Sequence, residues 1–162
     1  LSPASTAELS RGQQRESVAG FFQAIQRGRF RPPSFDSEVI TPAGGQLEAG
    51  GVTLRIPPGA VSEDVTIRMI VPNTPFLYVH FQPHGLEFDA PASLTFDLAG
   101  TEAKEGEGLL GVYVGAGLFS RGSSVLGSET FAVTRDDRGA TFSIDHFSGY
   151  IVASGNTARG TW

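Results

Sequence analysis

The sequence predicts an all-β protein, a two-sheet antiparallel β-sandwich of about eight strands that carries an N-terminal α-helical arm. Its 21 glycines and 10 prolines, with only 18% charged residues, are typical of short strands joined by tight turns. Apolar and polar residues alternate between Val39 and Ala153, which is the period of strands with one buried face. The chain of 162 residues is long enough to bury a core without disulfides, and it contains no cysteine.

Residues 1–35 are predicted to form the helical arm and a linker that follows it. Ser5 and Glu8 have the spacing of a capping box, which predicts that a helix begins near Thr6. Two consecutive prolines then deny helix and hold the preceding residue extended, so residues 29–33 are expected to be an extended linker.

An apolar stripe lies in the second half of this arm. Four apolar residues have the spacing i, i+3, i+4 and i+7, which predicts one buried face of a helix. They are Val18, Phe21, Phe22 and Ile25. Two hypotheses stay open, because the face could pack on the chain's own β-domain or dock onto another subunit. Trp162, in a tail of residues 156–162, is the other predicted interaction residue, since tryptophan is costly to leave exposed.

The β-sandwich domain is predicted over residues 36–155. It begins with a predicted hairpin in which residues 52–56 and 65–70 alternate and Pro57-Pro58-Gly59 turns the chain between them. Further strands are predicted from the same alternation at residues 78–82, 94–98, 110–114, 131–134, 140–144 and 150–153. The fourth and fifth of these ranges are expected to form a second hairpin around the turn at 136–139.

Two segments of this domain resemble the ZU-five domain family. The first is GGQLEAGGVTLRIPPGAVSEDVTIRM, residues 44–69. The second is a "P-x-G-x-x-F-x-x-P" frame before a strand, formed by Pro83, Gly85, Phe88 and Pro91. The resemblance covers residues 38–153 and leaves out the N-terminal arm. Members occur in ankyrins, netrin receptors, death-domain scaffolds and bacterial envelope proteins, so the resemblance implies a β-sandwich used for structure or docking, usually without enzymatic activity.

The resemblance also draws attention to His146-Phe147-Ser148, because some family members cleave their own backbone at a His-Phe-Ser sequence. Residues two apart lie on one face of a strand, so His146 is placed to accept the hydroxyl proton of Ser148 while that oxygen attacks the Phe147 carbonyl. Such cleavage also needs a strained peptide and an oxyanion donor. The competing hypothesis is structural: both polar residues bond neighbouring backbone, Phe147 lies in the core, and Gly149 permits a bulge.

Composition and motifs argue against several other classes of function. The net charge is −5 and the basic residues are scattered, so no footprint for nucleic acid is expected. No apolar run approaches the roughly 20 residues that cross a bilayer. The chain has no G-x-S-x-G elbow, Walker loop or dinucleotide fingerprint, so we expect no enzyme beyond intramolecular cleavage and no cofactor.

No metal site is expected either. His80 and His84 have the spacing of ligands on a helix, but Pro83 and Gly85 forbid that helix. A polar loop also carries three carboxylates without the alternating pattern of a calcium loop. They are Glu102, Glu105 and Glu107.

The favoured hypothesis is a non-enzymatic, exported bacterial subunit, periplasmic or at the cell surface, that attaches to a larger protein assembly. The N-terminal helix and the sheet edges would be its contacts. The polar Ser/Pro/Ala start resembles the spacer after a processed or lipid-anchored N-terminus. Two alternatives stay open: a module cleaved between Phe147 and Ser148, and a sandwich that binds carbohydrate or another surface ligand through loop aromatics such as Tyr78 and Tyr113.

Overall fold

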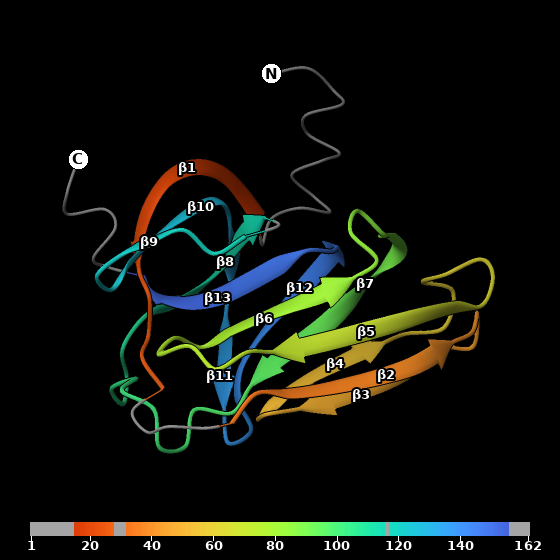
Figure 1. Cartoon of the computed structure of the whole chain (residues 1–162), viewed down its shortest axis with the longest axis horizontal. Coiled ribbons are helices and arrows are strands. Elements are labelled where there is room, and N and C mark those ends of the chain that lie inside the picture. Colours follow the sequence, from red (N-terminus) through yellow and green to blue (C-terminus); the bar gives the residue numbers. More distant parts are fainter. Residues whose placement is uncertain (1–14, 28–31, 116, 156–162) are drawn as a thin grey trace.

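The computed structural model describes residues 15–27, 32–115 and 117–155. These residues form thirteen β-strands and no helix, and the strands make two antiparallel sheets (Figure 1). The predicted all-β class and the two facing sheets are therefore confirmed. No helix among the described residues is a candidate for spanning a membrane.

The larger sheet has eight strands, in the order β1-β10-β8-β13-β6-β5-β2, with β9 paired to β10 beside this path. In the same order the bounds are β1 Arg15–Gln23, β10 Ser124–Ala132, β8 Leu109–Gly115, β13 Gly149–Ser154, β6 Tyr78–Gln82, β5 Val65–Val71, β2 Ser34–Ile40 and β9 Ser120–Arg121. The smaller sheet has five, in the order β11 Thr134–Asp136, β12 Gly139–His146, β7 Glu87–Phe96, β4 Val52–Ile56 and β3 Gly45–Ala49.

The main core lies between the two sheets and follows from the alternation. In β4, Val52, Leu54 and Ile56 are buried, while Thr53 is half-buried and Arg55 is exposed on the opposite face. The predicted hairpin between residues 52–56 and 65–70 is wrong, however, because β4 pairs with β3 and β7 whereas β5 pairs with β2 and β6. The Pro57-Pro58-Gly59 corner instead carries the chain from one sheet to the other, so the two strands contribute to the core from opposite sides.

The second predicted hairpin is confirmed only in its turn. β11 and β12 pair around that turn, with Asp136 opposite Gly139. Phe131 and Ala132 belong to β10 of the larger sheet, where they pair with β8. The chain crosses between the sheets at Val133, which the alternation alone does not reveal because both strands bury residues in the same core.

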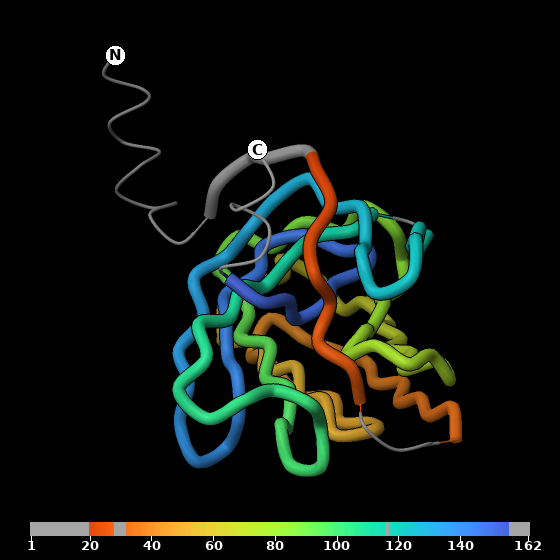
Figure 2. The backbone as a smooth tube through the Cα atoms, turned by 90° about the vertical axis from the view of Figure 1, so that its left-hand side faces the viewer, coloured from red at the N-terminus to blue at the C-terminus, as the bar shows by residue number. Residues whose placement is uncertain are grey.

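A second, smaller core lies on the outer face of the larger sheet. The ribbon of β1 and β10 curls back over that face, so that Ala24 bridges to Ala153 and the Ile25 amide donates to the Val152 carbonyl at 2.9 Å. Figure 2 shows β1 running across the outside of the strands that it covers. The buried residues between these layers are Phe22, Ala24, Phe76, Tyr78, Val112, Val125, Ile151 and Ala153. As a result every residue of β13 is buried.

The predicted N-terminal helix over the apolar stripe is wrong, because Arg15–Gln23 is strand β1. Phe21 lies opposite Leu126 and Phe22 opposite Val125, and this pairing with β10 overrides a helical spacing that only four residues supplied. Phe22 is buried and Phe21 is exposed, which is the alternation of a strand. The expected helix start near Thr6 and the tail with Trp162 lie outside the described residues.

The closeness of the two sheets can be tested at Gly111. A Cβ at this position would lie 2.6 Å from ring atoms of Phe142 in the opposite sheet. We expect Gly111→Ala to lower the free energy of unfolding by about 1–3 kcal/mol, measured by urea denaturation, because the ring must move in a packed core. Gly117→Ala is the matched control, since a Cβ there meets nothing within 4 Å. Equal stability of the two variants would contradict the packing described.

Candidate functional site

The candidate site lies where β12 ends and β13 begins. Strand pairing is irregular on both sides of this junction: the register of β12 with β7 shifts between Ile144 and His146, and that of β13 with β8 shifts between Gly149 and Tyr150. Phe147 and Ser148 lie between the two strands. The backbone of the His-Phe-Ser segment is therefore not the continuous extended strand on which the predicted geometry depended.

The side-chain partner of Ser148 is a histidine from another part of the chain. Ser148 is buried, and its Oγ lies 2.8 Å from Nδ1 of His84 in the turn after β6. The Phe81 amide donates to the Ser148 carbonyl at 2.9 Å, which fixes the segment against the end of β6. A serine hydroxyl in contact with an imidazole is the pairing that nucleophilic catalysis requires when the nitrogen acts as acceptor.

The peptide bond between Phe147 and Ser148 is held by the same turn. The Phe147 carbonyl accepts a hydrogen bond from the Gly85 amide at 3.3 Å, and the Phe147 amide donates to the Leu86 carbonyl at 3.0 Å. The Phe147 ring is buried, stacked on Phe81 at 4.6 Å. A backbone N–H aimed at this carbonyl would stabilise negative charge developing on its oxygen.

His146, the predicted base, has other partners. Its Nδ1 lies 2.9 Å from the Asp145 carboxylate, and its Nε2 lies 3.3 Å from the Glu129 carboxylate. Its ring is 4.6 Å from that of Tyr113, and its carbonyl accepts a hydrogen bond from the Tyr150 hydroxyl. The structure thus brings His84 to Ser148, while His146 faces a pair of carboxylates.

Two further titratable side chains flank this site on β6. Burial, and secondarily the neighbouring charge of His84, lower the pKa of His80 from its ordinary value of 6.5. Burial raises the pKa of Tyr78, whose ring stacks on that of His80 at 5.8 Å. The turn that carries His84 therefore borders an environment that disfavours charge. Among the residues described, no group of three or more His, Asp or Glu side chains could hold a metal ion.

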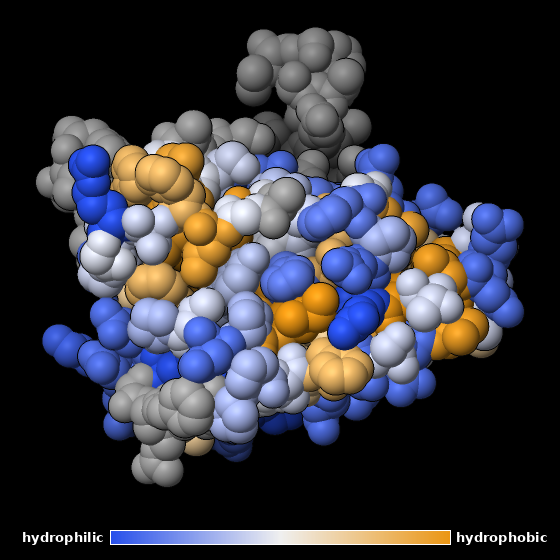
Figure 3. Space-filling view, viewed as in Figure 1, coloured by the Kyte–Doolittle hydropathy of each residue, from blue (hydrophilic) through white to orange (hydrophobic). Residues whose placement is uncertain are grey.

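The predicted interaction residues are divided between the core and the surface. Phe22 and Ile25 are buried, whereas Phe21 is 37% exposed. Phe21 belongs to an apolar patch with Phe119 and Leu126: its ring centroid is 6.2 Å from that of Phe119, and Leu126 is its partner across β10. In Figure 3 hydrophobic surface gathers over β1, β9 and β10, at the upper left of the view.

The loop aromatics named for ligand binding do not lie on loops. Tyr78 begins β6 and is buried in the outer core, and Tyr113 lies within β8, where its ring packs against Tyr150 at 5.3 Å. Neither ring offers an exposed platform on which a sugar could stack.

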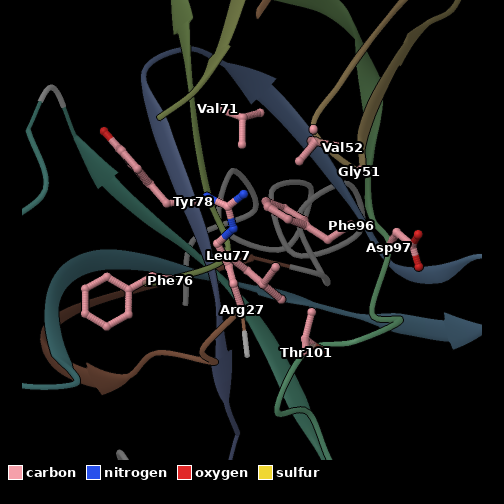
Figure 4. Close-up of a pocket in the computed structure, with 11 residues that line it drawn as sticks. Arg27, Gly51, Val52, Val71, Phe76, Leu77, Tyr78, Phe96, Asp97 and Thr101 are labelled. Carbon is pink, nitrogen blue, oxygen red and sulfur yellow. The ribbon is translucent and has the colours of Figure 1, made fainter. Parts of the chain in front are cut away.

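A small pocket beneath Arg27 has a structural role (Figure 4). The buried Arg27 guanidinium donates to the carbonyls of Pro72 at 3.0 Å and Thr74 at 3.3 Å, so it fastens the loop before β6. The space beside it, lined by Leu77 and Phe96 among others, measures about 10 Å³. That is room for roughly one water molecule and for no larger ligand.

No model of a known protein family matches the chain, and no curated protein matches it. The ZU-five resemblance accordingly stays a prediction that rests on the two motif segments.

The lowered pKa of His80 gives the folded protein a defined pH dependence. Below pH 6.5 His80 becomes protonated in the unfolded chain while it stays neutral in the folded protein. The free energy of unfolding therefore decreases as the pH falls towards the folded pKa. We expect NMR titration of the His80 ring to give a lower pKa in the folded protein than in urea. His80→Asn should reduce the loss of stability between about pH 7 and about pH 5. A folded pKa equal to or above the unfolded one would contradict this description.

Proposed function

We propose that this chain is a non-enzymatic docking module that attaches to a larger protein assembly through the edges of its larger sheet. What supports the proposal is the distribution of exposed apolar side chains. The described residues include five large hydrophobic side chains that are exposed, and all five lie on or beside β1 and β2, the two edge strands of that sheet. They are Phe21, Phe35, Val39, Phe119 and Leu126.

The patch of Phe21, Phe119 and Leu126 is the stronger of the two candidate contacts. Its side chains are contiguous, and the Leu126 amide donates to the Phe119 carbonyl, so a hydrogen bond fixes the loop that carries Phe119. Exposed aromatic and aliphatic side chains gathered in one place are typical of the centre of a protein interface. At the other edge the Arg68 guanidinium already covers the Phe35 ring, at 4.7 Å from its centroid.

The proposal includes export to the periplasm or the cell surface. Its support is the resemblance to bacterial envelope members of the ZU-five family, carried by residues 44–69 and by the Pro83 to Pro91 frame.

Docking can be tested by removing the apolar patch. We expect the full chain, immobilised and exposed to an extract of its source cells, to retain a protein that rebinds after separate purification. Phe119→Ser combined with Leu126→Ser should weaken that rebinding about tenfold or more, because exposed aromatic anchors dominate interface energies. Phe35→Ser at the opposite edge is the comparison variant: it should weaken rebinding much less, because the Arg68 guanidinium already covers the Phe35 ring. Equal rebinding by all three proteins would contradict the proposed contact.

A second candidate function is self-cleavage between Phe147 and Ser148, and the contact of Ser148 Oγ with His84 Nδ1 at 2.8 Å favours it. In this mechanism His84, protonated at Nε2, accepts the hydroxyl proton at Nδ1 while Oγ attacks the Phe147 carbonyl carbon. The Gly85 amide donates to the oxygen as it becomes negative.

The remaining steps balance without a cofactor. The carbon–nitrogen bond breaks, the departing Ser148 amine takes the proton from His84, and an ester joins Phe147 to Oγ. Water then hydrolyses the ester, which leaves a carboxylate on Phe147 and a new amino terminus on Ser148. β13 would stay in place, because it is paired with β6 and β8 on its two sides.

Intact-mass spectrometry distinguishes this candidate from the structural alternative. If cleavage occurs, two fragments divided between Phe147 and Ser148 should accumulate with time, and hydroxylamine should speed their formation by attacking the ester. Ser148→Ala should abolish them, and His84→Ala should slow them by about a hundredfold or more, the usual contribution of a general base. His146→Gln is the informative control, since it should slow cleavage much less. A chain that stays intact with hydroxylamine would exclude the candidate.

A further inference from the structure

The outer face of the smaller sheet carries a hollow of about 800 Å³ that the docking proposal does not use. It lies across β3, β4, β7 and β12, and its lining includes residues of the β3–β4 and β11–β12 turns. Its lining contains no apolar side chain larger than alanine. The lining residues are Gln46, Glu48, Ala49, Gly50, Gly51, Thr53, Arg55, Ser93, Thr95, Asp97, Asp137, Arg138 and Thr141.

The floor of this groove is a row of threonines at matched positions of neighbouring strands. Thr53 on β4 is the register partner of Thr95 on β7, which is in turn the partner of Thr141 on β12. All three are half-buried, and the hydroxyls of Thr95 and Thr141 lie 2.8 Å apart. At strand spacings of about 4.8 Å the row is roughly 10 Å long. Each hydroxyl has one donor and two acceptor positions, so the pair retains capacity for a ligand.

Charged side chains of both signs stand around this floor. The lining includes three carboxylates, of Glu48, Asp97 and Asp137, and two guanidinium groups, of Arg55 and Arg138. This near-balance gives no attraction for a polyanion such as nucleic acid. The absence of apolar lining equally disfavours a hydrophobic peptide, which needs pockets for its anchors. Some of these polar groups already bond one another, as Thr53 does with Glu48 and Arg55 with Gln46. Most hydroxyl and carboxylate oxygens can still accept a further hydrogen bond from a ligand.

We propose that this groove binds an oligosaccharide by its hydroxyl groups. A sugar hydroxyl both donates and accepts, which matches threonine hydroxyls on the floor and carboxylates with guanidinium groups at the rim. The length of the row suits several linked sugars better than one. No aromatic ring lines the groove, so binding depends on hydrogen bonds and is weak.

The test is an NMR titration of the full chain with four defined probes: cellohexaose, maltohexaose, chitohexaose and hexagalacturonate. We expect at least one to cause saturable shifts in the backbone amides of Thr53, Thr95 and Thr141, with a Kd of about 0.1–1 mM. Thr95→Val combined with Thr141→Val removes both partners of the hydroxyl contact while keeping side-chain shape, so the fold should survive. The Kd of this double variant should be at least about tenfold higher than that of the unaltered protein.

Thr66→Val is the matched control, because Thr66 is exposed on β5 of the other sheet and its loss should leave binding unchanged. Three outcomes of the sugar titration would overturn the proposal. They are no saturable shift with any probe at about 10 mM, shifts located on another face, and undiminished binding by the double variant. A charged control peptide is titrated in the same way. If it binds the groove saturably and no sugar does, the ligand is a polypeptide and not a glycan, and the proposal is overturned.

Discussion

Burial of β13 on both faces is the constraint on which the rest of this structure depends. One face of the strand packs into the core between the sheets and the other into the core under the β1–β10 ribbon, so Tyr150, Ile151, Val152 and Ala153 are all excluded from water. Full burial of one large apolar side chain contributes roughly 1.5–3 kcal/mol. Tyr150 is the centre of the aromatic packing, since its ring contacts those of Phe81, Tyr113, Phe131, Phe142 and His146. Phe142 belongs to the smaller sheet, so this cluster also joins the two layers.

The candidate site is a consequence of how the chain enters that buried strand. The chain must pass from β12 in one sheet to β13 in the other within two residues, and regular pairing is lost on both sides of the crossing. The backbone groups exposed there are satisfied by the turn after β6, which is where Gly85 and Leu86 bond to Phe147. The contact of Ser148 with His84 arises from the same approach of two segments. Whether the contact serves chemistry or only satisfies a buried hydroxyl, its geometry has one structural cause.

The alternation of side chains predicted β4, β6 and β13 closely, because each strand has a buried face whose period is visible in a few residues. It did not predict how strands are assigned to sheets, since β4 and β5 supply the same core from opposite sides and look alike in sequence. The strand β1 was mistaken for a helix because pairing with β10, about a hundred positions away along the chain, decides its conformation. His84 was missed as a partner of Ser148 for the same reason, being 64 positions away. The one local signal for it was the Pro83-His84-Gly85 turn, which fixes that histidine at a strand end.

The position of β13 also bears on how the molecule acquires its structure during synthesis. β6 and β8 lie on either side of this strand, and β13 follows both of them in the chain. Until the ribosome has released residues 149–154, β6 and β8 therefore have no common neighbour and their facing edges are open to other chains. Folding must wait for contacts of high sequence separation, which makes it slow compared with that of a helical domain of similar size.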